Sequence, residues 1–254
     1  MFIDTHCHLG DERFSSVDEV INNFKLANVD FVIDVGFDIF SSIKAKDTAN
    51  AYKEVYFSAG IHPDSQSQAN QDGLKQIQEL CKHEKCVALG EIGLDYHYEG
   101  FDKDGQTKAF LAQLELATAV KLPVQIHSRD CTEDMLKLLK QVKLPYGGVM
   151  HCFSGSKETA SELIKLGFYL SFAGTVTFKN ARNVQEVATL VPLDRFLTET
   201  DSPYLAPHPF RGQTNEPKYV PYVTHKIAEL KNLDVNFIAE KAKQNAKTLF
   251  YKIK

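Results

Sequence analysis

Short apolar segments rich in β-branched residues alternate with longer amphipathic segments, and this alternation limits the fold more than any other feature. Eight segments are predicted strands: Phe2–His6, Phe31–Val35, Val55–Ala59, Cys86–Gly90, Pro123–His127, Gly148–His151, Phe168–Phe172 and Arg195–Glu199. Predicted helices include Val17–Ala27, Gly73–His83, Thr107–Val120, Met135–Val142, Thr159–Leu166, Val184–Leu190, Val220–Leu230 and Val235–Phe250. Strands that alternate with helices form βαβ units and a parallel sheet.

Eight such units form either a closed barrel or an open doubly wound sheet, and both place their active sites at the carboxyl ends of the strands. The first predicted strand is not followed by a Gly-x-Gly-x-x-Gly motif or a phosphate-binding loop, which disfavours a nucleotide-binding open sheet. The length of 254 residues suits one barrel of about 250 residues. No linker, repeat or charge block divides the chain. We therefore predict a single (β/α)8 TIM barrel, an α/β fold, over residues 1–254.

Charge and cysteine content exclude several classes of protein. A net charge of -4 disfavours a broad grip on duplex nucleic acid, but permits a small site where metal ions supply positive charge to one strand end. The five cysteines are odd in number and form no Cys-x-x-Cys pair, so we expect no disulfide framework and a cytoplasmic location. We interpret Cys7 and Cys152, which adjoin histidines, as buried apolar residues rather than nucleophiles. No leader or membrane-spanning run is recognised, and no feature requires a protein partner.

Two histidines lie one residue apart at the end of the first predicted strand. Side chains alternate between the faces of a strand, so His6 and His8 project to the same side, about 6.5 Å apart along the chain. Two imidazoles at this spacing can hold one metal ion. Ordinary core or surface histidines also show this spacing, so the pair needs support from other residues.

Further potential ligands lie where other predicted strands end. They are His62, Glu91, His127, His151 and Asp201, at strands three, four, five, six and eight. In a parallel barrel all these positions surround one mouth. We therefore expect six side chains to converge on a divalent metal centre: His6, His8, Glu91, His127, His151 and Asp201. The alternatives are a salt bridge inside the barrel for Glu91 and a cap of the Ser-Pro turn for Asp201.

The donor set predicts the kind of metal. Four imidazoles and two carboxylates suit zinc, manganese, iron, cobalt or nickel, whereas sites built only from oxygen suit magnesium. Six ligands exceed the four of a tetrahedral zinc site, so we predict two ions with a bridging carboxylate. Two ions about 3.5–4 Å apart activate a water and neutralise a transferring phosphoryl group. Mg²⁺, Mn²⁺ and Zn²⁺ all remain candidates.

The motifs around these residues resemble those of the TatD family of metal-dependent deoxyribonucleases, part of the amidohydrolase-like barrel superfamily. They are the His6/His8 pair, Gly-Ile-His-Pro at 60–63, Gly-Glu-Ile-Gly-Leu-Asp at 90–95, Leu-Pro-Val-Gln-Ile-His-Ser-Arg at 122–129, His-Cys-Phe-Ser-Gly at 151–155, Thr-Glu-Thr-Asp-Ser-Pro-Tyr-Leu at 198–205 and Asn-Glu-Pro at 215–217. The resemblance extends from Phe2 to Phe250, and several blocks in order are more specific than any one. It implies a divalent-metal hydrolase acting on nucleic acid ends, often described as a 3′ to 5′ exonuclease. It also implies that the six residues bind metal, that Glu91 bridges, and that Glu199 is sometimes drawn into a further metal site.

We assign roles on this basis. Glu91 is expected to bridge two ions. The other ligands divide into His6, His8 and Asp201 at the more buried ion and His127 and His151 at the second. Asp201 is also placed to accept a proton from the attacking water. His62 either orients substrate or donates a proton to the leaving oxygen, or it only orients a metal ligand.

Four residues are predicted to contact substrate. Arg129 is expected to clamp a phosphate through its planar guanidinium, with a structural ion pair to Asp95 or Asp130 as the alternative. Phe153, Tyr96 and Tyr204 are candidates for stacking on a base, with packing under a loop as the alternative for each.

Three functions are weighed. The leading one is deoxyribonuclease action at DNA 3′ ends by a water that two metal ions activate, with a single-stranded DNA end or another nucleic-acid-derived substrate as partner. The second is metal-dependent hydrolysis of an ester or amide, such as a D-aminoacyl-tRNA, because an activated water also attacks a carbonyl. The third is a non-catalytic protein with a structural metal, which is disfavoured because structural zinc sites are closed cages of four ligands.

Overall fold

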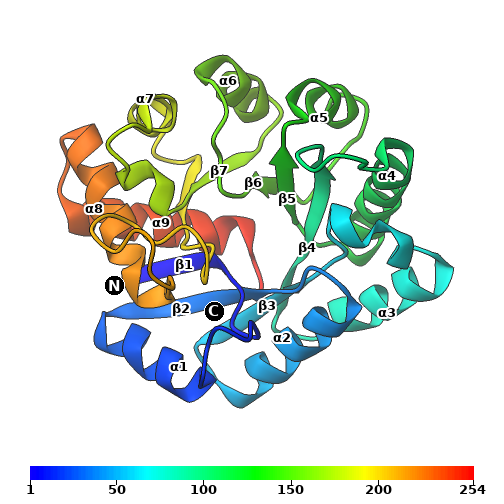
Figure 1. The fold of residues 1–254 in the computed structure, drawn as a ribbon, viewed down its shortest axis with the longest axis horizontal. Helices are drawn as coiled ribbons and strands as arrows, with labels where there is room; N and C mark the ends of the chain where they lie inside the picture. The colour runs from blue at the N-terminus through cyan, green and yellow to red at the C-terminus, as the bar shows by residue number, and fades with distance from the viewer.

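The computed structural model describes residues 1–254, and a sheet of eight parallel strands forms its centre (Figure 1). The strands are β1 (Phe2–Cys7), β2 (Val29–Val35), β3 (Val55–Ala59), β4 (Cys86–Asp95), β5 (Val124–Arg129), β6 (Gly148–Met150), β7 (Tyr169–Phe172) and β8 (Phe196–Thr198). Their order in space is their order in the sequence. The predicted alternation of strands and helices is confirmed.

The sheet closes where β1 meets the end of β8. Cys7 forms a parallel bridge with Ser202. The His8 amide donates to the Ser202 carbonyl at 2.8 Å, and the Asp201 amide donates to the His6 carbonyl at 2.9 Å. The architecture is therefore the predicted (β/α)8 barrel, and the open doubly wound alternative is excluded.

Helices surround the strands, and the colours of Figure 1 run round the ring in chain order. The α-helices are α1 (Val17–Leu26), α2 (Ile39–Ala51), α3 (Gln71–Cys81), α4 (Lys103–Val120), α5 (Thr132–Leu139), α6 (Lys157–Lys165), α7 (Arg182–Leu190), α8 (Val220–Lys231) and α9 (Val235–Leu249), and the 3-10 helices are η1 (Pro63–Gln68), η2 (Gly174–Thr177) and η3 (Pro217–Tyr219). α9 packs against β1, β8 and α8. No helix combines the length and the apolar character that crossing a membrane requires.

Local sequence explains why these elements begin where they do. Short polar side chains accept hydrogen bonds from the first-turn amides of six helices; they are Ser16, Asp38, Asn70, Asp102, Ser156 and Asp234. All ten residues of β4 are buried, as expected for a parallel strand covered on both faces. The strands and the inner helix faces share one core of 61 buried apolar residues.

Two features of the fold differ from the expectation. β4 extends to Asp95, so Glu91 lies within the strand rather than after it. α2 was not predicted, because its buried face consists of the small residues Ser42, Ala45 and Ala49 and therefore lacks a strong apolar periodicity. The other strand ends differ by one or two residues, as element boundaries commonly do.

Candidate metal centre

The carboxylate of Glu91 lies at the centre of the carboxyl-end mouth of the barrel. Its Oε1 is 2.9 Å from His127 Nδ1 and 2.8 Å from His151 Nε2. Its Oε2 is 3.5 Å from His6 Nε2 and 3.9 Å from His8 Nε2. The two oxygens of one carboxylate therefore face two different pairs of histidines.

Asp201 completes one of these two clusters. Its Oδ1 lies 3.7 Å from His6 Nε2 and 3.6 Å from His8 Nε2. We call His6, His8 and Asp201 the first ligand group, and His127 and His151 the second ligand group. In each group, potential ligand atoms lie within 4.8 Å of one another, with Glu91 included in the second. The structure thus brings all six predicted ligands together.

The residues fit divalent ions. The Nε2 of His6 is completely buried and has no hydrogen-bond partner, although it faces the carboxylates of Glu91 and Asp201. An unpartnered buried nitrogen is costly unless something binds it. The opposite nitrogen is already bonded, since His6 Nδ1 contacts Gln125 Oε1 at 2.9 Å. His8 is held in the same manner, with Nδ1 at 2.8 Å from the Val35 carbonyl. Both rings are therefore oriented with Nε2 toward the cluster.

Charge within the cluster shifts the titration of its members. Burial alone would raise the pKa of Glu91, but the charge of His151 and the contact with His127 lower it well below its usual value. Burial would lower the pKa of His8, but the carboxylates of Asp201 and Glu91 raise it to about 9. Histidines must be neutral to bind a metal, so ion binding at this mouth releases protons.

The turn that carries Asp201 is tied to β1 by a buried carboxyl group. The Thr200 amide and hydroxyl donate to Asp4 at 2.9 and 2.5 Å, and the His6 amide donates to it at 3.2 Å. Burial raises the pKa of Asp4 to about 8. Asp201 itself has a φ of 54°, a left-handed conformation that Asp and Asn adopt more readily than most residues. This bracing positions Asp201 opposite His6 and His8.

A glycine allows β4 and β5 to approach beside His127. Gly93 has a φ of 151°, and a Cβ at this position would lie 1.9 Å from the His127 carbonyl oxygen. A larger residue would therefore displace β5 and His127 with it. The glycines of the Gly-Glu-Ile-Gly-Leu-Asp segment are part of the geometry of the centre.

A cavity of about 380 Å³ opens above the cluster. Beside the ligands, it is lined by Phe37, His62, Asp64, Asp95, Tyr98, Arg129 and Tyr204. His62 Nδ1 accepts from the Asp64 amide at 3.2 Å, and its Nε2 lies 3.8 Å from Glu91 Oε1. His62 therefore lies against the cluster and reaches the cavity, which is compatible with each predicted role.

Arg129 and Tyr204 line the cavity as expected for substrate contacts. The alternative for Arg129, an ion pair with Asp95 or Asp130, is wrong, because those carboxylates contact His127 and His97 instead. The Arg129 guanidinium lies 5.5 Å from the centre of the Tyr98 ring. Tyr204 is 47% exposed, and the Arg13 guanidinium covers its ring at 4.1 Å.

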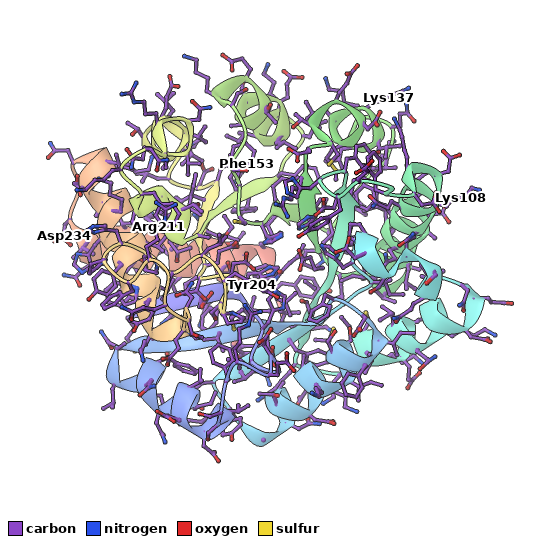
Figure 2. All side chains as sticks on the ribbon, in the orientation of Figure 1. Lys108, Lys137, Phe153, Tyr204, Arg211 and Asp234 are labelled. Carbon is purple, nitrogen blue, oxygen red and sulfur yellow. The ribbon has the colours of Figure 1, made fainter.

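The other two predicted substrate contacts lie outside this cavity. Tyr96 donates its hydroxyl to Asp134 at 3.1 Å, and its ring stacks on Phe101 at 4.4 Å. Phe153 is buried and lines a smaller neighbouring cavity of about 220 Å³. Figure 2 shows Phe153 and Tyr204 on the inner side of the helix ring, whereas Lys108 and Lys137 project outward from α4 and α5. Tyr96 therefore lies outside the cavity and packs under a loop, which is the alternative to stacking on a base.

Several residues at the centre were not predicted. Tyr98 and Phe37 line the cavity, and Gln125 holds His6. Asp95 also belongs to them, with Oδ2 3.0 Å from His127 Nε2. Glu199, which the resemblance drew into a further metal site, has its Oε1 3.4 Å from His151 Nδ1. Asp95 ends the Gly-Glu-Ile-Gly-Leu-Asp motif, which was the available signal. The Glu199 contact joins it to the second ligand group.

Of the two cysteines beside ligand histidines, Cys7 is buried as expected, whereas Cys152 is half-buried. The Cys7 thiol is buried and donates to the Ile33 carbonyl at 3.4 Å. Burial raises the thiol pKa of both Cys7 and Cys152 well above the usual value. The thiolate form of these two cysteines is therefore disfavoured, and so is a role for either of them as a nucleophile.

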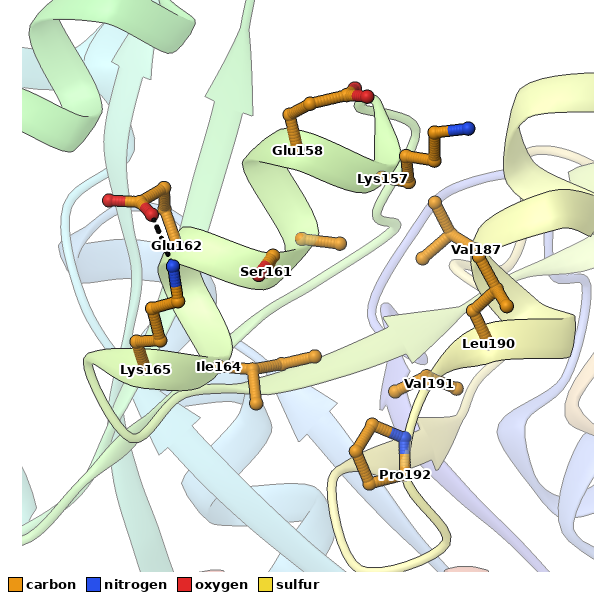
Figure 3. A pocket seen from close by; sticks show the side chains of 11 residues that line it. Lys157, Glu158, Ser161, Glu162, Ile164, Lys165, Val187, Leu190, Val191 and Pro192 are labelled. Carbon is orange, nitrogen blue, oxygen red and sulfur yellow. Dashed lines mark hydrogen bonds and ion pairs between the residues drawn. The ribbon is translucent and has the colours of Figure 1, made fainter.

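Larger hollows occur on the outside of the barrel. Figure 3 shows one of about 640 Å³ between α6 and α7, with the Glu162–Lys165 ion pair at its edge. Its lining contains no histidine or cysteine, and its apolar residues include Ile164, Val187 and Leu190. The groups capable of chemistry are gathered at the mouth instead.

Comparison with known proteins identifies the family of this chain. The chain matches the family described as TatD related DNase over residues 3–251. It is 46% identical over 252 residues to the uncharacterized metal-dependent hydrolase YabD of Bacillus subtilis, covering 98% of this chain and 99% of that one. It is 38% identical over 254 residues to the uncharacterized metal-dependent hydrolase YcfH of Escherichia coli, covering 98% and 95%. The crystal structure of YJJV, a TatD homolog from Escherichia coli, matches with a TM-score of 0.94 at 32% identity over 98% of both chains. This chain therefore belongs to the TatD family and is a metal-dependent hydrolase.

Proposed function

We propose that this hydrolase cleaves phosphodiesters at the 3′ ends of DNA with the help of two divalent ions. One observation carries the proposal: the two oxygens of Glu91 face separate ligand groups, at 2.8 and 2.9 Å on one side and 3.5 and 3.9 Å on the other. A carboxylate in that position is suited to bridge. When bound, two ions would lower the pKa of the attacking water and neutralise charge on the phosphoryl group.

Residues of the chain supply proton transfer and orientation. Asp201 is 14% exposed at its side chain and borders the cavity, so it is placed to accept a proton from the water. His62 reaches the same cavity from the other side of Glu91 through its Nε2. It is suited to donate a proton to the leaving oxygen or to orient the substrate.

The cavity wall is suited to a strand end rather than to a duplex. A volume of about 380 Å³ lies in the range of small-molecule sites. Arg129 offers a planar fork to a phosphate, and Tyr98 and Tyr204 offer rings to a base. The overall charge of -4 supplies no broad basic face for a double helix.

One observation favours a second candidate, hydrolysis of a small ester such as the aminoacyl ester of D-aminoacyl-tRNA. Arg129 is the only lysine or arginine that lines the cavity, and Asp64 and Asp95 line it as well. Little positive charge is therefore available beside a phosphate at the bond that is cleaved, whereas an aminoacyl ester carries no charge at that bond. The same activated water would attack a carbonyl.

A substrate panel distinguishes the two candidates. Purified protein is supplied with Mn²⁺, Mg²⁺ or Zn²⁺ and tested on single-stranded DNA with a free or a blocked 3′ end, on duplex DNA and on D-aminoacyl-tRNA. We expect nucleotide release from free 3′ ends and its loss in Asp201→Asn. Asp130→Asn, which removes an exposed carboxylate paired with His97, is the matched control and should remain active. Equal activity in Asp201→Asn would reveal a contaminating nuclease and contradict the proposal.

A further inference from the structure

The two ligand groups carry unequal charge. The first ligand group contains a carboxylate of its own, Asp201, in addition to Glu91 Oε2 nearby. The second ligand group contains only His127 and His151 and relies on Glu91 Oε1 for negative charge. A second cation in that half of the centre would therefore have less direct charge compensation than the first.

Negative charge behind the histidine rings is distributed the other way: it lies behind the second ligand group and not behind the first. Behind the first ligand group, His6 contacts the neutral amide of Gln125, and His8 contacts the neutral carbonyl of Val35. Behind the second ligand group, both rings face carboxylates. Asp95 Oδ2 is hydrogen-bonded to His127 Nε2 at 3.0 Å. Glu199 Oε1 lies 3.4 Å from His151 Nδ1, which is buried and makes no hydrogen bond.

These two carboxylates are buried and held in place by backbone amides. Asp95 is 4% exposed, and its Oδ1 accepts from the His97 amide at 2.9 Å. Glu199 is 1% exposed, and its Oε1 accepts from the Cys152 amide at 2.7 Å. The other oxygen of Glu199 is buried without a partner. Neither carboxylate pairs with a lysine or arginine, so neither belongs to an ordinary structural ion pair.

We infer that Asp95 and Glu199 are positioning residues that set the affinity of the second ligand group for its ion. This inference rests on the proposed two-ion function. A carboxylate behind a histidine fixes the orientation of the ring and makes its other nitrogen a stronger ligand. The two buried charges also compensate for the carboxylate that the second ligand group lacks.

Two further ion sites are the competing interpretations, because the ligand atoms of His62, Asp95 and His127 lie within 4.8 Å of one another, and so do those of His6, His151 and Glu199. His127 argues against the first of these sites. Its Nδ1 faces Glu91 at 2.9 Å and its Nε2 faces Asp95 at 3.0 Å. A neutral imidazole has one nitrogen that can donate a lone pair and one that carries a proton. The ring can therefore bind one ion with Nδ1 while Nε2 donates to Asp95.

Metal titration tests the inference without measuring activity. The full-length protein is stripped with a chelator and titrated calorimetrically with Mn²⁺ and with Zn²⁺, and bound metal is counted by elemental analysis. The variants are Asp95→Asn and Glu199→Gln, with Asp130→Asn as the control at the same rim. We expect two ions in the wild type. In each test variant the weaker ion should lose about 10- to 100-fold in affinity, while the tighter ion changes less than about twofold.

The outcomes separate the possible failures. A single ion in the wild type overturns the two-ion proposal and this inference with it. If both ions bind to Asp95→Asn and Glu199→Gln with unchanged affinity, this inference alone is overturned. It is also overturned if a variant weakens both ions equally while its metal-free melting curve matches that of the wild type. A third bound ion that disappears only in Asp95→Asn, or only in Glu199→Gln, establishes the competing site that contains that residue and also overturns the inference.

Glu199→Gln is less certain to fold than Asp95→Asn, because the side chain lies deeper. A metal-free melting curve recorded for each variant identifies a folding defect before titration. If Glu199→Gln fails to fold, Asp95→Asn decides the outcome, since Asp95 lines the open cavity and its only side-chain partner is His127. If Asp95→Asn lowers the affinity for the second ion by the expected amount, about 10- to 100-fold, the inference is supported. If that affinity is unchanged, the inference is overturned.

Discussion

The floor and the wall of the barrel mouth differ in how firmly the fold holds their side chains. On the floor, His6 is completely buried, Glu91 is 5% exposed, and hydrogen bonds hold the rings of His6, His8 and His127 from behind. On the wall, Tyr98 is 60% exposed and Tyr204 is 47% exposed, and both lie on loops. Strands and the residues directly after them therefore position the groups that act on a water, whereas loops carry Tyr98 and Tyr204; Arg129, the third wall residue, ends β5. Loops vary more readily than strands, so one floor can serve several substrates.

The largest effect is expected on the floor. Glu91→Gln removes the charge shared by both ligand groups and should lower kcat/KM by on the order of 1,000-fold, since metal catalysis supplies several kcal/mol. Bound metal, measured by elemental analysis after dialysis, should fall for both ions. Loss of only one ion would show that Glu91 does not bridge and would remove the main distinction between floor and wall.

A wall residue should act on binding instead. Arg129→Ala removes the only lysine or arginine in the cavity and should raise KM about 10- to 100-fold, as expected for a charge-assisted hydrogen bond, with the metal content unchanged. Arg129→Lys retains the charge without the planar fork, so its KM should lie between those of the wild type and Arg129→Ala. Steady-state kinetics on DNA with a free 3′ end provide the measurement. A fall in kcat with constant KM would show that Arg129 acts in the chemical step, as the floor residues do, and not in substrate binding.

Tyr204 should show a smaller effect of the same kind. One face of its ring is covered by Arg13, so stacking on a base is available from the other face only. Tyr204→Leu should raise KM about fivefold, corresponding to roughly 1 kcal/mol, and Tyr204→Phe should match the wild type. If Tyr204→Phe shows the same defect as Tyr204→Leu, the hydroxyl rather than the ring contacts the substrate.

The smallest effect on activity is expected for a change at Asp34, a buried residue of β2 that is not a predicted metal ligand. Asp34 is 2% exposed, its Oδ1 accepts from the Leu9 amide at 2.9 Å, and burial raises its pKa to about 6. The folded state therefore retains this proton up to a higher pH than the unfolded state, whose Asp pKa is about 3.9. Its contribution to stability is complete below the unfolded pKa and is lost as the pH rises through 6.

Asp34→Asn should abolish this loss. Between pH 4 and pH 8 the wild type should become about 2 kcal/mol less stable relative to Asp34→Asn. Urea unfolding of the metal-free proteins at several pH values measures the difference, and kcat at neutral pH should stay near the wild-type value. Parallel stability curves would show that the carboxyl group is already charged in the folded protein and that the floor tolerates a buried charge there.

The regions that were predicted well are those governed by periodicity. The eight strands follow from β-branched runs, and six potential ligands meet because the carboxyl ends of parallel strands share one mouth. α2 escaped prediction since Ser42, Ala45 and Ala49 give its buried face no apolar signal. Tyr96 and Tyr98 are two residues apart in one loop, and sequence offers no rule for which of them faces the cavity.

The order of residues along this chain was therefore sufficient to specify a barrel and the strand ends where metal ligands gather, because strand alternation and parallel pairing are local rules. Only the folded molecule shows that Glu91 directs its two oxygens to different ligand groups and that Asp95 and Glu199 stand behind His127 and His151. Those relations join residues far apart in the sequence. They depend on side-chain direction and on loop paths, which are decided by packing across the whole barrel rather than by neighbouring residues.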